Sequence, residues 1–173
     1  MHLSTYVNLS GQVALERRMA TIAQNIANAQ TVGYRADRVT FESVMADTAQ
    51  LETTFVSDGE TYLDETQGSV KFTGNPLDVA LTGPLFLGVT GPSGTYYSKD
   101  GRLSTTVDGT LVNIGGDVVQ DSGGSAISID AALGQVTVSG DGWVMQQGRR
   151  VAQLGLFEID TSRGYTRMGS VGV

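Results

Sequence analysis

The residues most able to do chemistry are one histidine and 18 carboxylates, and their positions favour turns over catalysis. The histidine is His2, and one histidine so early in the chain makes a Ser-His-Asp triad or a multi-histidine metal site implausible. Asp100, Asp108 and Asp141 each precede a glycine, as in tight turns where aspartate bonds its own backbone and glycine takes a positive φ. A glycosidase needs two carboxylates across a cleft, and no spacing here demands that arrangement.

Two other features could bind a ligand. The only tryptophan, Trp143, follows Asp141 as in some sugar sites, but a core or edge anchor is the commoner role. Arg149-Arg150 is an isolated basic pair, typical of a solvated hairpin. The sequence lacks phosphate-binding glycine loops and a D-x-D-x-D-G calcium loop, and it has no cysteine. We therefore predict no catalytic residue, no cofactor and no metal.

Charge and hydropathy limit the classes of partner and the locations that the sequence allows. A formal charge of −7 argues against nucleic acid, which requires clustered lysine and arginine. No stretch approaches 18 consecutive apolar residues, so we expect no membrane-spanning helix, and the N-terminal residues do not resemble a signal peptide. Taken alone, these features favour a cytosolic protein.

Glycine usage divides the chain. Residues 1–50 hold two of the 23 glycines, which leaves 21 for the other 123 residues. Because glycine weakens helices and serves turns, the first part should be helical and the rest short strands. We predict an α+β fold with an N-terminal helical assembly domain (1–35), an extended connector (36–70) and a mostly antiparallel β domain (71–173).

The helical segment carries a narrow apolar seam. Apolar residues recur at intervals of 4, 3, 4 and 3 at Leu15, Met19, Ile22, Ile26 and Ala29. An earlier stripe contains Leu9 and Val13, and Gly33 could supply a left-handed residue past the helix end. The seam could pack on its own domain, but the β half is a poor partner for a helix over 5–30. We favour packing against other helices.

The rest of the chain reads as extended structure and strands. Residues 39–45 could form a short strand or helix, and 46–69 are polar with little apolar periodicity. Alternating apolar residues predict strands at 77–81, 127–129 and 136–138. Turn pairs separate the strands at 100–101, 108–109, 115–116, 123–124 and 141–142.

Three stretches together resemble the flagellar rod and hook protein family. Residues 22–35, IAQNIANAQTVGYR, resemble its N-terminal signature. Residues 73–81, TGNPLDVAL, are similar to the segment that opens its β domain, and residues 97–103, YSKDGRL, are similar to a hairpin of that domain. The closest likeness is to the proximal-rod (FlgF) type, with distal-rod or hook-type axial proteins as the alternative.

The resemblance implies a structural subunit of the basal-body rod that transmits torque. It implies export without a cleaved signal into the periplasm and packing against other rod subunits, copies of itself or surrounding ring proteins. The expected assembly interface comprises Leu9, Val13, Leu15, Met19, Ile22, Asn25, Ile26, Asn28, Ala29, Thr31, Gly33, Tyr34 and Arg35.

Two departures from the family and one alternative class accompany this interpretation. Residues 82–86, TGPLF, replace a more acidic run of the family, and the family's C-terminal helix is absent from the sequence. The alternative class is a peptidoglycan-active, carbohydrate-binding or hydrolysing β protein. A phage-tail-like β module would not explain the helical signature.

Overall fold

The computed structural model describes residues 2–48, 51–161, 165–168 and 172–173 of the 173-residue chain. The chain forms two compact units. The first comprises Met1–Gln30, Arg35–Asp64 and Thr161–Tyr165, and the second comprises Thr31–Tyr34, Glu65–Asp160 and Thr166–Val173. The helical signature is therefore divided between the units, since Thr31–Tyr34 belong with the β-rich one.

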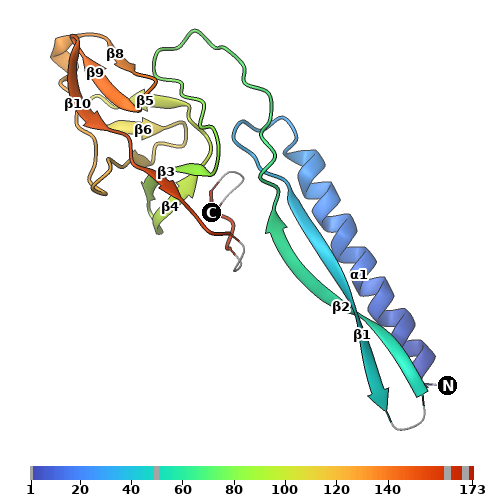
Figure 1. Ribbon diagram of the computed structural model, residues 1–173. Helices are drawn as coiled ribbons and strands as arrows, with labels where there is room; N and C mark the ends of the chain where they lie inside the picture. The colour runs from blue at the N-terminus through green and yellow to red at the C-terminus, as the bar shows by residue number, and fades with distance from the viewer. Residues whose placement is uncertain (1, 49–50, 162–164, 169–171) are drawn as a thin grey trace. The chain divides into compact units, whose positions relative to one another are not determined.

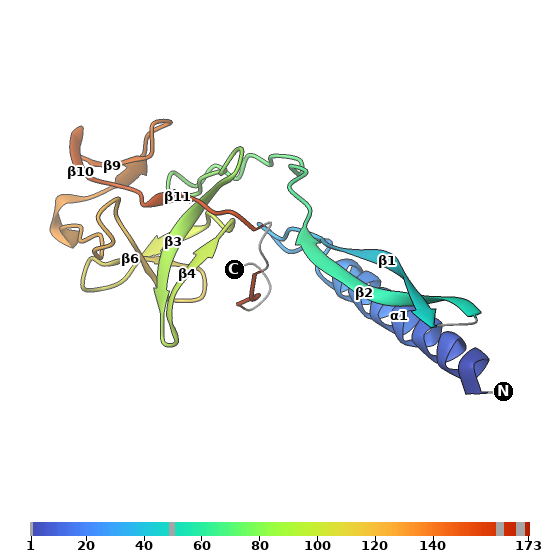
Figure 2. The ribbon, with the colours of Figure 1, turned by 60° about the horizontal axis from the view of Figure 1, so that its bottom comes forward.

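The first unit is a helix packed along a β hairpin (Figures 1 and 2). Helix α1 spans His2–Ala27, contains one glycine and lacks proline, so little interrupts it. Strands β1 (Asp37–Thr48) and β2 (Leu51–Leu63) pair antiparallel, with an irregularity between Val39 and Phe41.

The hairpin differs from the extended connector expected for residues 36–70. The chain is extended there, but it pairs with itself and contacts α1. The hairpin is not predicted from the sequence, because no Asn-Gly or Asp-Gly pair lies between Thr48 and Leu51. Residues 65–81, by contrast, contain no helix or strand.

The second unit contains two antiparallel sheets. Strands β11, β3, β7, β6 and β5 follow one another in the larger sheet, and β4 pairs with β3. The smaller sheet has the order β10-β9-β8. The strands are β3 (Leu85–Gly91), β4 (Gly94–Ser98), β5 (Leu103–Thr105), β6 (Leu111–Asn113), β7 (Val118–Val119), β8 (Val136–Val138), β9 (Trp143–Gln146), β10 (Arg149–Gln153) and β11 (Leu156–Glu158). A short 3-10 helix, η1, spans Ala131–Leu133.

Aliphatic side chains from both sheets form the core of this unit. Val89 and Val119 come from the larger sheet, Val144 comes from the smaller one, and all three are fully buried. Ile127 and Leu154 join them from connecting segments. The α+β class predicted from the sequence is confirmed, with one long helix followed by antiparallel sheets.

Most of the predicted turns have the expected backbone. Gly109, Gly116, Gly124 and Gly142 all have φ between 77° and 86°. The prediction is wrong at Gly101, which does not have a positive φ. A Cβ there would lie 1.9 Å from the carbonyl oxygen of Val79, so close backbone approach requires the glycine. The strand predicted at 77–81 does not form.

Candidate assembly interface

Helix α1 turns a face of small and polar residues toward its own hairpin. Ala14 is 6% exposed, and the half-buried positions around the same face are Ser10, Gly11, Thr21, Asn25 and Asn28. Positions 10, 14, 21, 25 and 28 recur at helical spacing, so they lie on one side of the helix. Small side chains let helix and hairpin approach closely but bury little apolar area.

The larger apolar residues of α1 are exposed instead. Leu15 is 61% exposed, Met19 71%, Ile22 47% and Ile26 70%. We call these four residues the seam. Leu9 and Val13 are exposed on another side of the helix, and Ala29 is exposed past its end. Exposed apolar stripes of this kind are typical of interaction surfaces.

Asn25 of the signature joins the helix to the first residue of β1. Its Nδ2 donates to the carbonyl oxygen of Asp37 at 2.9 Å, and its Oδ1 accepts from the Asp37 backbone N–H at 3.0 Å. The amide thus completes both hydrogen bonds of one residue, as a strand neighbour would. Tyr165 also donates through its hydroxyl to the Asp37 carboxylate.

Asn28 bonds inside the helix end. Its Nδ2 donates to the Gln24 carbonyl oxygen at 3.0 Å, and its backbone N–H donates to the same oxygen at 3.1 Å. These contacts satisfy a carbonyl group at the end of α1. Asn25 and Asn28 therefore position backbone within the first unit.

A turn at Thr31–Tyr34 follows the helix and lies in the second unit. The Tyr34 backbone N–H donates to the Thr31 carbonyl oxygen at 3.2 Å, and Gly33 at the third position has a φ of 77°. Glycine at that position is what a type II turn requires. The Tyr34 ring lies 4.8 Å from the Arg167 guanidinium, while Arg35 is half-buried in the first unit.

Gly33 packs directly on the hairpin segment of the second recognisable motif. A Cβ at Gly33 would lie 2.5 Å from the Asp100 backbone nitrogen and 2.6 Å from the Lys99 carbonyl carbon. Gly101 in turn lies against Val79, whose N–H donates to the Gly101 carbonyl oxygen at 2.9 Å. Parts of all three family-like stretches therefore meet around the backbone of residues 99–101.

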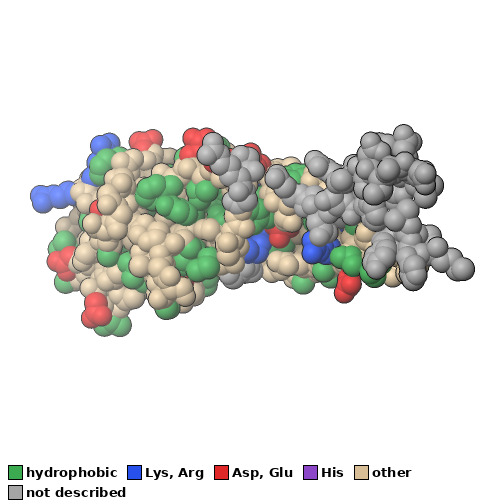
Figure 3. Space-filling view, turned by 90° about the horizontal axis from the view of Figure 1, so that it is seen from below, with side chains coloured by type: hydrophobic (Ala, Val, Ile, Leu, Met, Phe, Trp, Pro, Cys, Tyr) green, Lys and Arg blue, Asp and Glu red, His purple; other side chains and the backbone are tan. Residues whose placement is uncertain are grey.

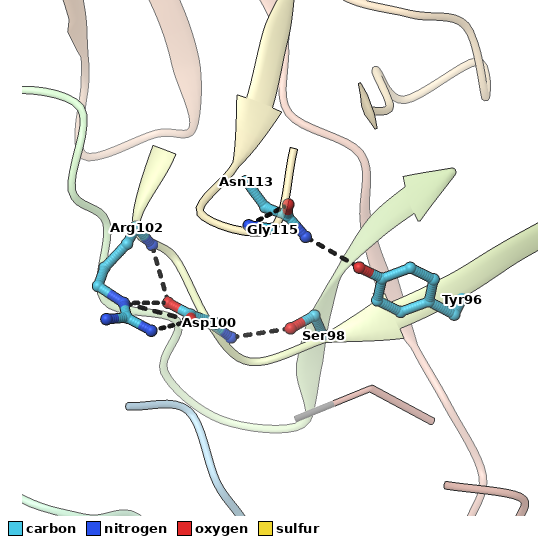
Figure 4. A network of polar contacts seen from close by, with 6 residues as sticks. All are labelled: Tyr96, Ser98, Asp100, Arg102, Asn113 and Gly115. Carbon is cyan, nitrogen blue, oxygen red and sulfur yellow. Dashed lines mark hydrogen bonds and ion pairs between the residues drawn. The ribbon is translucent and has the colours of Figure 1, made fainter. Parts of the chain in front are cut away.

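Charged side chains hold this backbone in place. Arg102 donates through Nη2 to Asp100 at 2.5 Å and through Nε at 2.9 Å, and its backbone N–H donates to the same carboxylate (Figure 4). The hydrogen bond to Asp100 raises the pKa of Arg102, and burial opposes this. Lys99 donates to the Gly83 carbonyl oxygen at 2.5 Å and lies over the Phe86 ring.

A second polar group braces the neighbouring strands. The Tyr96 hydroxyl donates to Asp117 at 2.6 Å and accepts from Asn113 Nδ2 at 2.9 Å, and Asn113 Oδ1 accepts from the Gly115 N–H (Figure 4). Burial, followed by the hydrogen bond to Asp117, raises the pKa of Tyr96 to about 12. These contacts are structural, since each polar group bonds another part of the same sheet.

The described residues contain no group of three or more His, Cys, Asp or Glu side chains placed to hold a metal ion. No helix in the described part of the chain is long and apolar enough to cross a membrane. The structure places Trp143 half-buried, under the Arg150 guanidinium at 4.9 Å.

Comparison with known proteins gives the family. Residues 6–35 match the model of the flagella basal body rod protein family, and residues 80–146 match the flagellar hook protein FlgE/F/G D1 domain. Over 173 residues the chain is 42% identical to the flagellar basal-body rod protein FlgF of Mesorhizobium japonicum, covering all of this chain and 72% of that protein. The chain belongs to the FlgF family of flagellar basal-body rod proteins.

Two further FlgF relatives agree. The Rhizobium meliloti protein is 40% identical over 173 residues, covering all of this chain and 72% of the relative. The Caulobacter vibrioides protein is 36% identical over 174 residues, covering 98% of this chain and 71% of the relative. The resemblance to the FlgF type and the structural role in the flagellar basal body are therefore confirmed.

The structure separates the predicted FlgF-family interface into three groups. The seam, with Leu9, Val13 and Ala29, is exposed; Asn25 and Asn28 bond their own unit; Thr31, Gly33 and Tyr34 form the turn of the second unit. Sequence reasoning missed Asp37 and Asp100 as partners of the signature. The only indication of such partners in the sequence is the presence of Asn25 and Gly33 in the signature.

Proposed function

We propose that this FlgF-family chain is an axial subunit whose exposed seam packs against helices of neighbouring rod subunits. The observation that carries the proposal is the orientation of α1. The helix packs its face of small residues against its own hairpin. The side chains of Leu15, Met19, Ile22 and Ile26 are left exposed to solvent. A 3–4 spaced stripe is the pattern that helices use to pack against one another.

The energetics favour several neighbours over one. Burying each of the four seam side chains contributes at most about 1.5–3 kcal/mol, or at most about 6–12 kcal/mol in all before costs, because each is already partly buried. Association costs about 4–15 kcal/mol in lost translational and rotational freedom. One helix pair therefore nearly breaks even, whereas contacts with two or more neighbours give a stable assembly. This fits a tube in which each subunit touches several others.

In this role the chain lies in the periplasmic part of the rod, is exported without a cleaved signal and has no enzymatic activity. Its partners are other rod subunits and copies of itself, with surrounding ring proteins as further contacts. The domain that assembles is the helical segment, and the β-rich unit contacts neighbours or a ring. The family membership and the exposed seam support these assignments.

Two charges placed on the seam test the proposal. The double variant Ile22→Asp and Ile26→Asp should fold normally, because both side chains are exposed, yet fail to enter basal bodies. The measurement is the amount of this subunit in basal bodies purified from a strain that expresses only the variant. Far-UV circular dichroism should show unchanged helix content.

The matched control is Ala23→Asp with Gln24→Asp. It adds the same charge at two exposed positions of the same helix outside the seam and should assemble normally. Normal rods from the isoleucine double variant, or equal loss from both, would refute the role of the seam.

A further inference from the structure

The segment between β2 and β3 exposes its backbone as well as its side chains. Residues 65–81 contain no helix or strand, and residues 65–76 are all exposed (Figures 1 and 2). Residues 67–72 form no hydrogen bond with any other part of the chain that the structure describes. Their N–H and C=O groups are therefore open to a protein that binds extended backbone.

Both ends of this open stretch are fixed. Before it, the Asp64 N–H donates to the Ala36 carbonyl oxygen at 2.8 Å. After it, the Asp78 carboxylate accepts hydrogen bonds from Thr73 Oγ1 and Asn75 Nδ2, both at 2.8 Å. The open stretch is therefore short and lies between two anchored points.

Lys71 and Phe72 are the two residues of this stretch that an enzyme could recognise. Lys71 is exposed, and Phe72 is 94% exposed. Hydrophobic side chains form several separate patches on the face drawn in Figure 3, so exposure of an apolar side chain alone does not mark a site. What distinguishes Lys71 and Phe72 is that the backbone carrying them makes no hydrogen bond.

Lys71 is also the only exposed lysine or arginine outside helix and strand among the residues that the structure describes. Five other basic residues lie in helix or strand, at Arg17, Arg18, Arg38, Arg149 and Arg150. The remaining four are buried or half-buried, at Arg35, Lys99, Arg102 and Arg167. Because an endopeptidase binds several residues of extended chain, it cuts within helices and sheets only after local unfolding.

We propose that the bond between Lys71 and Phe72 is a cleavage site for an endopeptidase whose acidic S1 pocket takes the lysine side chain. The step is hydrolysis and consumes one water. The bond from the Lys71 carbonyl carbon to the Phe72 nitrogen breaks, which leaves a carboxylate on Lys71 and an amino group on Phe72. The site does not involve the seam, so it does not rest on the proposed function.

The cut chain remains one particle, because each fragment contributes a segment to the unit that the other fragment mostly forms. Fragment 1–71 supplies Thr31–Tyr34 to the second unit, and fragment 72–173 supplies Thr161–Tyr165 to the first. In the second unit Gly33 packs on the backbone of Asp100. In the first, the Tyr165 hydroxyl donates to the Asp37 carboxylate. Cleavage therefore breaks the chain without releasing either fragment.

Brief digestion of the full native chain with trypsin tests this, with the products identified by mass spectrometry. The first cut should give fragments 1–71 and 72–173, which should elute together on size-exclusion chromatography and separate in denaturant. Lys71→Gln should slow the first cut at least about tenfold, since cleavage elsewhere requires local opening. Chymotrypsin, whose S1 pocket is a hydrophobic slot, should cut first after Phe72, and Phe72→Ala should remove that cut.

Arg18→Gln is the matched control for Lys71→Gln. It removes an exposed basic residue within α1 and should leave the rate of the first tryptic cut unchanged. Thermal unfolding of each variant checks that the fold is intact.

Two results overturn the proposal. A first tryptic cut after any residue other than Lys71, or an equal slowing by Arg18→Gln, contradicts the cleavage site. Fragments that separate in native buffer contradict the exchange of segments between the units. Neither result bears on incorporation into basal bodies through the seam, which is measured separately.

Discussion

Gly33 lies against the backbone of Asp100, close enough that a Cβ on the glycine would come within 2.5 Å of the Asp100 nitrogen. The two residues are 67 positions apart in the sequence, yet both belong to motifs typical of the family. The contact explains why a glycine stands at the end of the helical signature. It satisfies a positive φ and leaves room for a second backbone at the same time.

Gly33→Ala should therefore destabilise the second unit by more than about 2 kcal/mol, because the left-handed backbone alone costs about 1–2 kcal/mol and the contact with Asp100 adds to it. The control is Gly74→Ala, since Gly74 has a φ of 79° and open space around its Cβ position. Denaturant unfolding followed by the fluorescence of Trp143, the only tryptophan, compares the two. Equal losses would mean that the contact adds nothing.

Asn25→Ala should loosen the start of β1. It removes two hydrogen bonds to the Asp37 backbone, each worth about 1 kcal/mol, and so should speed exchange of the Asp37 amide hydrogen by about thirtyfold. Hydrogen exchange measured by NMR reports this directly. Gln24→Ala, on the same turn with an exposed side chain, should leave the rate unchanged. Unchanged exchange in Asn25→Ala would show that the amide does not hold the strand.

Tyr96 should make stability fall at high pH. Its folded pKa is about 12 against an ordinary 10.0, so between these values the folded chain keeps a proton that the unfolded chain loses. The contribution is complete below pH 10.0 and disappears as pH rises toward about 12. Tyr96→Phe should flatten the decline of unfolding free energy in this interval. Parallel curves for the two proteins would contradict the assignment.

Arg102→Ala should destabilise the second unit by about 1–2 kcal/mol, since it removes charge-assisted hydrogen bonds from the nearly buried carboxylate of Asp100. Arg38→Ala is the comparison, because its partner Asp64 in the first unit is more exposed and water can replace the lost contact. Chemical denaturation of each variant should show a clear loss for Arg102→Ala only. A larger loss for Arg38→Ala would reverse this ranking.

The helix and the turns of this fold could be predicted because local chemistry determines them. A single glycine in 26 residues and a 3–4 apolar spacing are enough to predict α1. The Asp-Gly pairs at Gly109 and Gly142 likewise predict their turns. The β1–β2 hairpin could not be predicted, because the sequences of its strands are largely polar and no Asn-Gly or Asp-Gly pair lies between them.

For the candidate site, the sequence predicts which residues form the apolar stripe but not which residues the signature contacts. Sequence spacing identifies the seam, and the structure shows its side chains exposed. The bonds from Asn25 to Asp37 and the contact of Gly33 with Asp100 join segments whose distance in sequence says nothing of their distance in space. Gly101 was assigned to a turn for the same reason, since its approach to Val79 appears only in three dimensions.

The division of the chain into units has a mechanical consequence. The backbone passes between the two units five times, at Gln30–Thr31, Tyr34–Arg35, Asp64–Glu65, Asp160–Thr161 and Tyr165–Thr166. The two units are therefore joined covalently at five points of the chain. A bead-on-a-string arrangement would join them at one.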